Sequence, residues 1–162
     1  PMFVRSLAVM AWSLPLVGGL SAAEPLGPQA AELARARQQG IAFLKASQRD
    51  DGSWTSSEAP GVTGLVTFGL LSAGVPANDP VITKALAHLQ GYRQPDGGVY
   101  NPKTHHGNYE TAIAMMVFHA AKDAGQFEEL LKQGDQYVRG VQWDESEKLD
   151  RSDVKYGGAG YG

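Results

Sequence analysis

The sequence predicts an all-α protein built from helical-hairpin repeats, and two observations lead to this prediction. Segments with apolar residues at helical spacing alternate with glycine-rich loops. The loops also carry a recurring motif of glutamine, glycine and an aromatic residue. Its two copies, at a shift of about 46 residues, are Gln48, Gly52 and Trp54, then Gln94, Gly98 and Tyr100. Two helices in each period of about 47 residues are typical of a helical-hairpin array.

The first helix is predicted over residues 29–48, which are rich in the helix formers Ala, Leu, Arg and Gln. Leu33, Ile41 and Leu44 recur there at helical spacing. A loop rich in aspartate, glycine and serine follows over residues 49–61 and ends this helix.

The second helix is predicted over residues 63–72, and Gly74 fits the position after a helix end. Apolar residues cover nearly the whole circumference of this segment, including Leu65 to Leu71. A helix of that kind normally lies in a protein core. We therefore expect it to be buried on every side.

The same order of elements recurs further along the chain. Asn78-Asp79-Pro80 predicts an N-cap and a first-turn proline for a helix that ends near Gln90. A loop over residues 95–98, a second apolar and buried helix over 110–124 and an amphipathic helix over 127–141 follow. The resulting units span residues 29–74, 75–125 and 126–162. The third unit ends before its apolar helix, so we expect it to be incomplete.

Residues 1–23 are typical of a signal peptide. Arg5 supplies a positive charge, an apolar run follows, and Ser21-Ala22-Ala23 offers small residues at a cleavage position. The alternative is a membrane anchor, but a proline and two glycines interrupt the run, which falls short of the roughly 20 apolar residues that a span requires. We expect export to the periplasm, the envelope or the outside of the cell. Cleavage would leave a leader over residues 24–28 and no transmembrane span.

The composition limits the chemistry that this segment can perform. The chain has no cysteine and a formal net charge of -3. It therefore has no disulfide, no thiolate nucleophile and no cysteine metal site, and its charge favours neither nucleic acid nor an anionic membrane as a partner. Phosphate-binding loops, the nucleophile elbow and the zinc-helix motif are also missing from the sequence. We predict no cofactor.

The spacing of the loop motif resembles that of a known superfamily. The QW repeat of squalene–hopene and oxidosqualene cyclases is similar to the pattern made by Gly40, Leu44, Gln48, Gly52 and Trp54. The segment Asp96-Gly97-Gly98-Val99-Tyr100 resembles the degenerate form shared with protein prenyltransferase β-subunits. The resemblance covers about residues 29–162. It implies an α/α toroid, in which inner and outer rings of helices surround an apolar cavity and the remaining repeats of the same polypeptide complete the ring.

The motif residues are interpreted as structural. Gln48 can bond backbone groups left open at a helix end, Gly52 permits a tight loop, and Trp54 can cover the amide from water. The same interpretation applies to the second copy, which consists of Gln94, Gly98 and Tyr100. Because each repeat buries its apolar face only against the next, we expect the isolated chain to self-associate.

The catalytic residues are unknown from the sequence. Squalene–hopene-type cyclases use an acidic Asp-x-Asp-Asp cluster, whereas Asp50-Asp51 is only a pair and is favoured as a solvated turn. Protein prenyltransferases hold zinc with Asp, Cys and His, and the chain has no cysteine. His105 and His106, with Glu110, are candidate metal ligands. Adjacent histidines normally diverge, however, so a solvated loop is the favoured interpretation, with no metal site.

Three functions stay open on this basis. The first is a cyclase-like or transferase-like protein that binds or transforms an isoprenoid, or binds another apolar small molecule, in an apolar cavity. The second, held level with the first, is a non-catalytic periplasmic or envelope toroid that binds an apolar ligand or a protein partner. The third is an envelope polysaccharide-processing enzyme, which rests on fold analogy alone.

Overall fold

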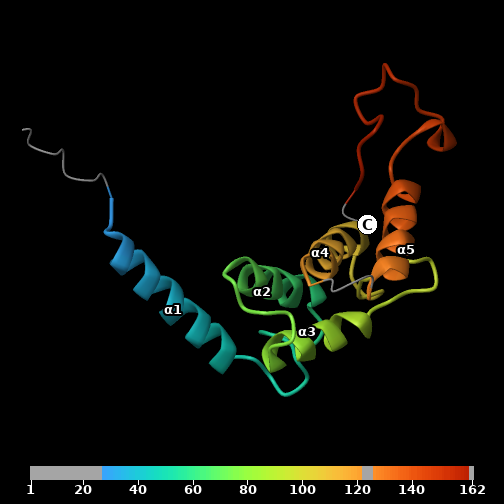
Figure 1. Cartoon of the computed structure of the whole chain (residues 1–162). Coiled ribbons are helices and arrows are strands. Elements are labelled where there is room, and N and C mark those ends of the chain that lie inside the picture. Colours follow the sequence, from blue (N-terminus) through green and yellow to red (C-terminus); the bar gives the residue numbers. More distant parts are fainter. Residues whose placement is uncertain (1–26, 122–125, 161–162) are drawn as a thin grey trace, which may run out of the picture.

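The computed structural model describes residues 27–121 and 126–160, and its regular secondary structure there is helical (Figure 1). The helices are α1 (Ala30–Ala46), α2 (Pro60–Ser72), α3 (Pro80–Gln90), α4 (Gly107–Ala120), α5 (Glu128–Gly140) and the short 3₁₀ helix η1 (Glu145–Glu147). The prediction of an all-α protein is therefore confirmed for these residues. The predicted signal peptide over residues 1–23 and most of the leader lie outside the described residues.

Prolines and a capping carboxylate set two of the helix starts. Pro60 occupies the first turn of α2, so this helix begins at Pro60 and not at residue 63. Pro80 does the same in α3, where Asp79 Oδ1 accepts a hydrogen bond from the backbone N–H of Val81 at 3.0 Å. Helix α4 begins earlier than predicted, at Gly107 and not at residue 110, and it ends at Ala120.

Helices α2 and α4 lie side by side at the centre of the fold, with α3 against α2 and α5 against α4 (Figure 1). The central pair approach closely because α2 has a glycine at the contact: a Cβ at residue 64 would lie 2.5 Å from Ile113 Cγ2. The largest fully buried apolar side chains of the described residues are Leu70, Ile82, Leu89, Val99, Val117 and Phe118.

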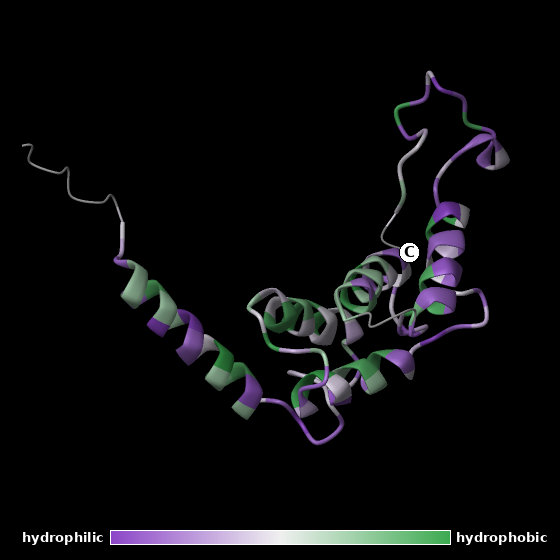
Figure 2. Cartoon of the chain, viewed as in Figure 1, coloured by the Kyte–Doolittle hydropathy of each residue, from purple (hydrophilic) through white to green (hydrophobic). Residues whose placement is uncertain are grey.

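The expectation that the two apolar helices are buried on every side is wrong. On α2, Val62 and Leu65 are 38% and 49% exposed, and on α4, Tyr109 and Met116 are 39% and 47% exposed. The apolar composition of α2 is plain in Figure 2. Helix α2 packs against α3 and α4, and α4 packs against α2, α3 and α5, but the described residues leave these side chains uncovered.

Helix α1 is attached to the rest of the fold only near its C-terminal end. Its end is held by the indole N–H of Trp54, which donates to the Leu44 carbonyl oxygen at 2.8 Å, and by an ion pair between Lys45 and Asp79. The helix has no buried residue, and most of its length projects away from the other helices (Figure 1). Two of its large apolar side chains, Leu33 and Phe43, are exposed.

Candidate functional site

Three tight turns share one backbone hydrogen-bond pattern, and we call them the first, second and third glycine turns. In the first, Arg49 N donates to Ser53 O at 2.9 Å and Gly52 N donates to Arg49 O at 3.0 Å. In the second, Gln94 N donates to Gly98 O and Gly97 N donates to Gln94 O. The third is a longer loop, in which Trp143 N donates to Gly158 O and Gly157 N donates to Trp143 O. One glycine in each turn has positive φ: Gly52 at 86°, Gly97 at 92° and Gly157 at 78°.

This pattern corrects the sequence alignment of the loop motif by one residue. Gly52 corresponds to Gly97 and not to Gly98, because Gly97 carries the positive φ. Trp54 likewise corresponds to Val99 and not to Tyr100. The backbone N–H groups of Trp54 and Val99 both donate to a buried threonine hydroxyl, at 3.4 and 3.0 Å respectively.

Tyr100 has a different environment from Trp54. It is half-buried, its ring stacks on Tyr137 with centroids 5.4 Å apart, and its hydroxyl donates to Asp96 Oδ2 at 2.6 Å. That hydrogen bond to a carboxylate, with burial, raises the pKa of Tyr100 to about 12. Tyr100 therefore stays protonated at neutral pH and serves as a contact between the second glycine turn and α5.

The glutamines of the motif bond to backbone carbonyls. Gln48 Nε2 donates to Gly52 O at 3.1 Å and to Val81 O at 2.8 Å, so both of these bonds come from one end of the amide. Gln142 Nε2 donates to Gly157 O at 2.7 Å and so takes the place of Gln48 in the third turn. Gln94 instead reaches the carbonyls of Tyr92 and Tyr100, at 3.0 and 2.9 Å, because the residue at the place of Gln48 in the second turn is Arg93.

The candidate metal ligands lie at the start of α4 in different environments. His105 and His106 are exposed, whereas Glu110 is only 5% exposed and its Oε2 accepts a hydrogen bond from Asn101 N at 2.8 Å. Burial raises the pKa of Glu110, partly offset by that hydrogen bond and by the charge of His106. Within residues 27–121 and 126–160, no group of three His, Asp or Glu side chains could hold a metal ion.

Asn101 was not singled out by the sequence, yet it joins the loops before α2 and α4. Besides its bond to Glu110, its Nδ2 donates to Glu58 O at 2.9 Å, and its Oδ1 accepts from Lys103 N at 3.0 Å. The hydroxyl of Tyr92 also donates to Ser57 O in the first of these loops. Asn101 precedes a proline, a pairing that favours a turn and could have drawn attention to it.

One aspartate of the Asp50-Asp51 pair in the first glycine turn, Asp51, has a structural role. Asp51 Oδ1 accepts hydrogen bonds from Ser53 Oγ at 2.6 Å and from Ser53 N at 3.0 Å. These bonds, the side-chain one first, lower the pKa of Asp51, so the carboxylate stays ionised at neutral pH. An open hollow of about 500 Å³ beside the turn is lined by Gln48, Arg49, Asp50 and Asp51.

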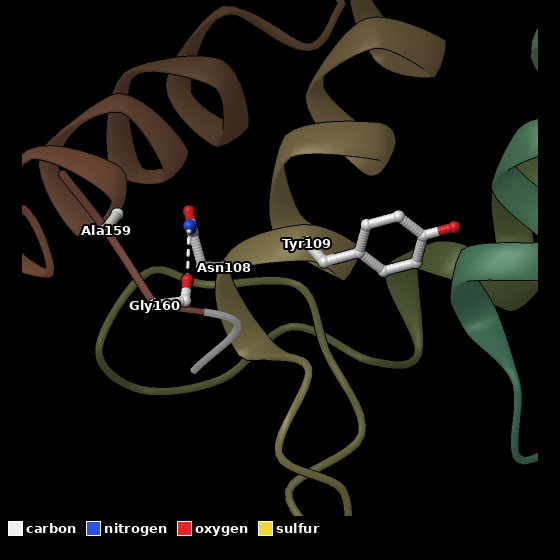
Figure 3. A pocket seen from close by; sticks show the side chains of 4 residues that line it. All are labelled: Asn108, Tyr109, Ala159 and Gly160. Atoms are coloured by element: carbon white, nitrogen blue, oxygen red, sulfur yellow. Dashed lines mark hydrogen bonds between the residues drawn. The ribbon is translucent and has the colours of Figure 1, made fainter.

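A smaller hollow of about 240 Å³ lies at the start of α4 and is lined by Asn108, Tyr109, Ala159 and Gly160 (Figure 3). Asn108 Nδ2 donates to Gly160 O at 2.8 Å and so joins α4 to the third glycine turn. Figure 3 shows that the Tyr109 ring points away from this bond. A Cβ at residue 61 would lie 3.0 Å from that ring, so Tyr109 connects the exposed side of α4 with the start of α2.

Neither the family models nor the curated proteins that were compared with this sequence include a match. Across residues 27–121 and 126–160, none of the helices combines the length and the apolar character that a membrane crossing requires. The site is therefore interpreted from its own geometry. Its main feature is the set of exposed apolar side chains on α2 and α4, which we call the apolar α2/α4 surface and define by Val62, Leu65, Tyr109 and Met116.

Proposed function

We propose that this chain is part of an exported α/α toroid of the terpenoid cyclase and prenyltransferase kind, and that its apolar α2/α4 surface binds an isoprenoid or another elongated apolar molecule. The observation that supports this function is the exposure of large apolar side chains on the two central helices. Contiguous exposed apolar patches on proteins mark binding sites for ligands or partners, and these four side chains come from two helices that pack side by side. A branched hydrocarbon chain is a ligand whose chemistry matches such a surface.

Binding is better supported than catalysis by the environments of the charged groups. The Glu110 carboxyl accepts a hydrogen bond from the backbone of the loop before α4. Asp51 and Asp79 accept hydrogen bonds that lower their pKa values. Acid catalysis of the cyclase kind needs a carboxylic acid that keeps its proton and faces the substrate. The two aspartates stay ionised, and Glu110 Oε2 faces the backbone of Asn101.

A titration with farnesol tests this proposal. Leu65→Ser removes one apolar contact from a half-exposed position. We expect a rise of about three- to tenfold in the dissociation constant, since a ligand can bury only the exposed half of this side chain and burial of a whole leucine contributes about 1.5–3 kcal/mol. Isothermal titration calorimetry would measure it.

The matched control is Val154→Ser, which changes a fully exposed apolar residue in the loop after η1. This variant should bind farnesol as the unchanged chain does. Equal affinities for all three proteins, or no binding by any of them, would contradict the proposed function.

A further inference from the structure

Helices α2 and α4 run in the same direction, so the apolar α2/α4 surface consists of two aligned rows of side chains. A Cβ at residue 61, in the first turn of α2, would lie 3.0 Å from Tyr109 Cε1 in the first turn of α4. A Cβ at residue 64, one turn further along α2, would lie 2.5 Å from Ile113 Cγ2, one turn further along α4. Contacts that advance together along both segments require parallel helices.

Leu65 and Met116 lie at the same level of this surface. A Cβ at residue 64 would lie 3.8 Å from Val117 Cγ2, so the two helices meet there. Leu65 directly follows residue 64, and Met116 directly precedes Val117. Both side chains are about half exposed, at 49% and 47%. An elongated apolar molecule that covers Leu65 therefore also reaches the thioether of Met116.

The two methionines of the described residues are neighbours in the sequence but have different environments. Met115 is only partly exposed, and its Cγ and Sδ each lie 3.0 Å from a Cβ built on Gly134 in α5, so its thioether is packed between α4 and α5. Met116 points about 100° further around the helix, to the side that α5 leaves uncovered. A dissolved oxidant therefore reaches Met116 more readily than Met115.

Oxidation changes the polarity of a methionine without breaking the chain. The thioether sulfur attacks one oxygen of hydrogen peroxide, the O–O bond breaks, an S–O bond forms, and the second oxygen leaves as water. Sulfur is oxidised by two electrons and the peroxide is reduced by two, and the product is a polar sulfoxide. On Met116 the new oxygen can stay hydrated. An apolar ligand that covers it would remove that water without supplying a hydrogen-bond donor.

We propose that Met116 is an oxidation site that controls the apolar α2/α4 surface: its conversion to the sulfoxide by a peroxide lowers the affinity of the surface for its apolar ligand. This inference rests on the proposed function, because the ligand is what the oxidation displaces. The effect is reciprocal, since a ligand that covers Met116 also shields it from the oxidant. Reduction of the sulfoxide restores the thioether and, with it, binding.

Farnesol titrations before and after treatment with dilute hydrogen peroxide test the effect on affinity. We expect the dissociation constant of the treated chain to rise about fivefold or more, because the ligand must cover an unpaired polar group. Met116→Leu keeps an apolar side chain of similar volume that a peroxide does not oxidise. This variant should bind farnesol as the untreated chain does, both before and after treatment.

Met115→Leu is the matched control, and it should lose affinity on treatment as the unchanged chain does. Met116→Leu also retains Met2 and Met10, so it accounts for oxidation of those two residues. An equal loss of affinity in Met116→Leu and in the unchanged chain would overturn the inference while the proposed function stands. No binding by the untreated chain would remove the proposed function, and this inference with it.

Tandem mass spectrometry tests the accessibility directly, because a fragment between residues 115 and 116 separates the two sulfoxides. We expect Met116 to be oxidised several-fold faster than Met115 in the folded chain. Saturating farnesol should slow the oxidation of Met116 and leave that of Met115 unchanged. Equal rates at the two methionines, or a rate at Met116 that bound farnesol does not alter, would contradict the proposed site.

Discussion

At the scale of single residues, the three turn glycines show two different reasons why a turn requires glycine. All three have positive φ, a conformation that costs other residues about 1–2 kcal/mol. Only Gly52 and Gly97 also lie against the backbone of a neighbouring helix. The free energy that each glycine contributes should therefore depend on whether a helix is docked beside it.

Gly52→Ala and Gly157→Ala are the matched pair for this difference. We expect Gly52→Ala to lower the free energy of unfolding by about 2 kcal/mol or more, because overpacking adds about 1–3 kcal/mol to the backbone strain. Gly157→Ala should cost only the strain, about 1–2 kcal/mol. Urea denaturation at low protein concentration measures both, and equal losses would show that the contact with Lys84 carries no cost.

Glu110 gives a pH dependence with a defined sign. Burial raises its pKa, so the folded chain binds the proton more tightly than the unfolded chain does. This carboxyl therefore lowers stability progressively as the pH rises from its ordinary value near 4.5 through its raised value. Glu110→Gln keeps an acceptor for Asn101 N and removes the titration. Relative to the unchanged chain, we expect its melting temperature to improve between pH 4 and pH 7.

Glu110→Ala is the control for the hydrogen bond alone. It leaves the buried N–H of Asn101 without its acceptor, which costs about 1–3 kcal/mol. We expect this variant to melt below the Gln variant at every pH. A Gln variant whose melting temperature tracks that of the unchanged chain from pH 4 to pH 7 would mean that Glu110 does not titrate differently on folding.

At the scale of helices, the packing of α2 against α4 depends on one small residue. Gly64 lies against Ile113, whereas Gly69 in the same helix is exposed, and a Cβ added there would meet nothing within 4 Å. Two glycines in one helix thus have opposite expected responses to a methyl group. The response at residue 64 depends on packing, and the response at residue 69 depends on helix propensity alone.

Gly64→Ala should destabilise the chain by about 1–3 kcal/mol through overpacking against Ile113. Gly69→Ala should stabilise it by up to about 1 kcal/mol, because alanine is the better helix former. Adding Ile113→Ala to Gly64→Ala should recover part of the loss in a double-mutant cycle. Additive effects of the two substitutions would argue against the close contact of α2 with α4.

The helices themselves were largely predictable from the sequence, because their signals are local. Pro80 after Asp79 places the start of α3, and apolar periodicity predicts the helices that follow. The exposed sides of α2 and α4 were not predictable, since an all-round apolar pattern shows no face and exposure depends on which neighbours are present. Nor could the sequence tell Gly97 from Gly98, because only the folded turn shows which of the two has positive φ.

At the scale of the whole molecule, stability is expected to be uneven. Helices α3 and α4 contribute most of the buried apolar side chains of the described residues, whereas α1 has no buried residue. Most of the stability of a helix in a protein comes from tertiary packing, which α1 has only near its C-terminal end. Local opening should therefore be easiest along α1.

Hydrogen exchange measures this difference. In a dilute sample we expect the backbone amides of α1, especially from residue 34 to residue 38, to exchange much faster than those of α2 and α4. Uniform protection of helices α1 to α5 at low concentration would contradict the uneven stability.

The sequence by itself determined that the described chain is helical and where its helices and glycine loops lie, because caps, prolines and periodicity act within a few residues. The tertiary structure decided which sides of α2 and α4 are exposed, which glycine in each turn takes the left-handed conformation, and which turns have a helix against them. Those features depend on atoms far apart in the chain. Gly52 and Gly157 have the same local turn, and only the presence or absence of a neighbouring helix makes them different.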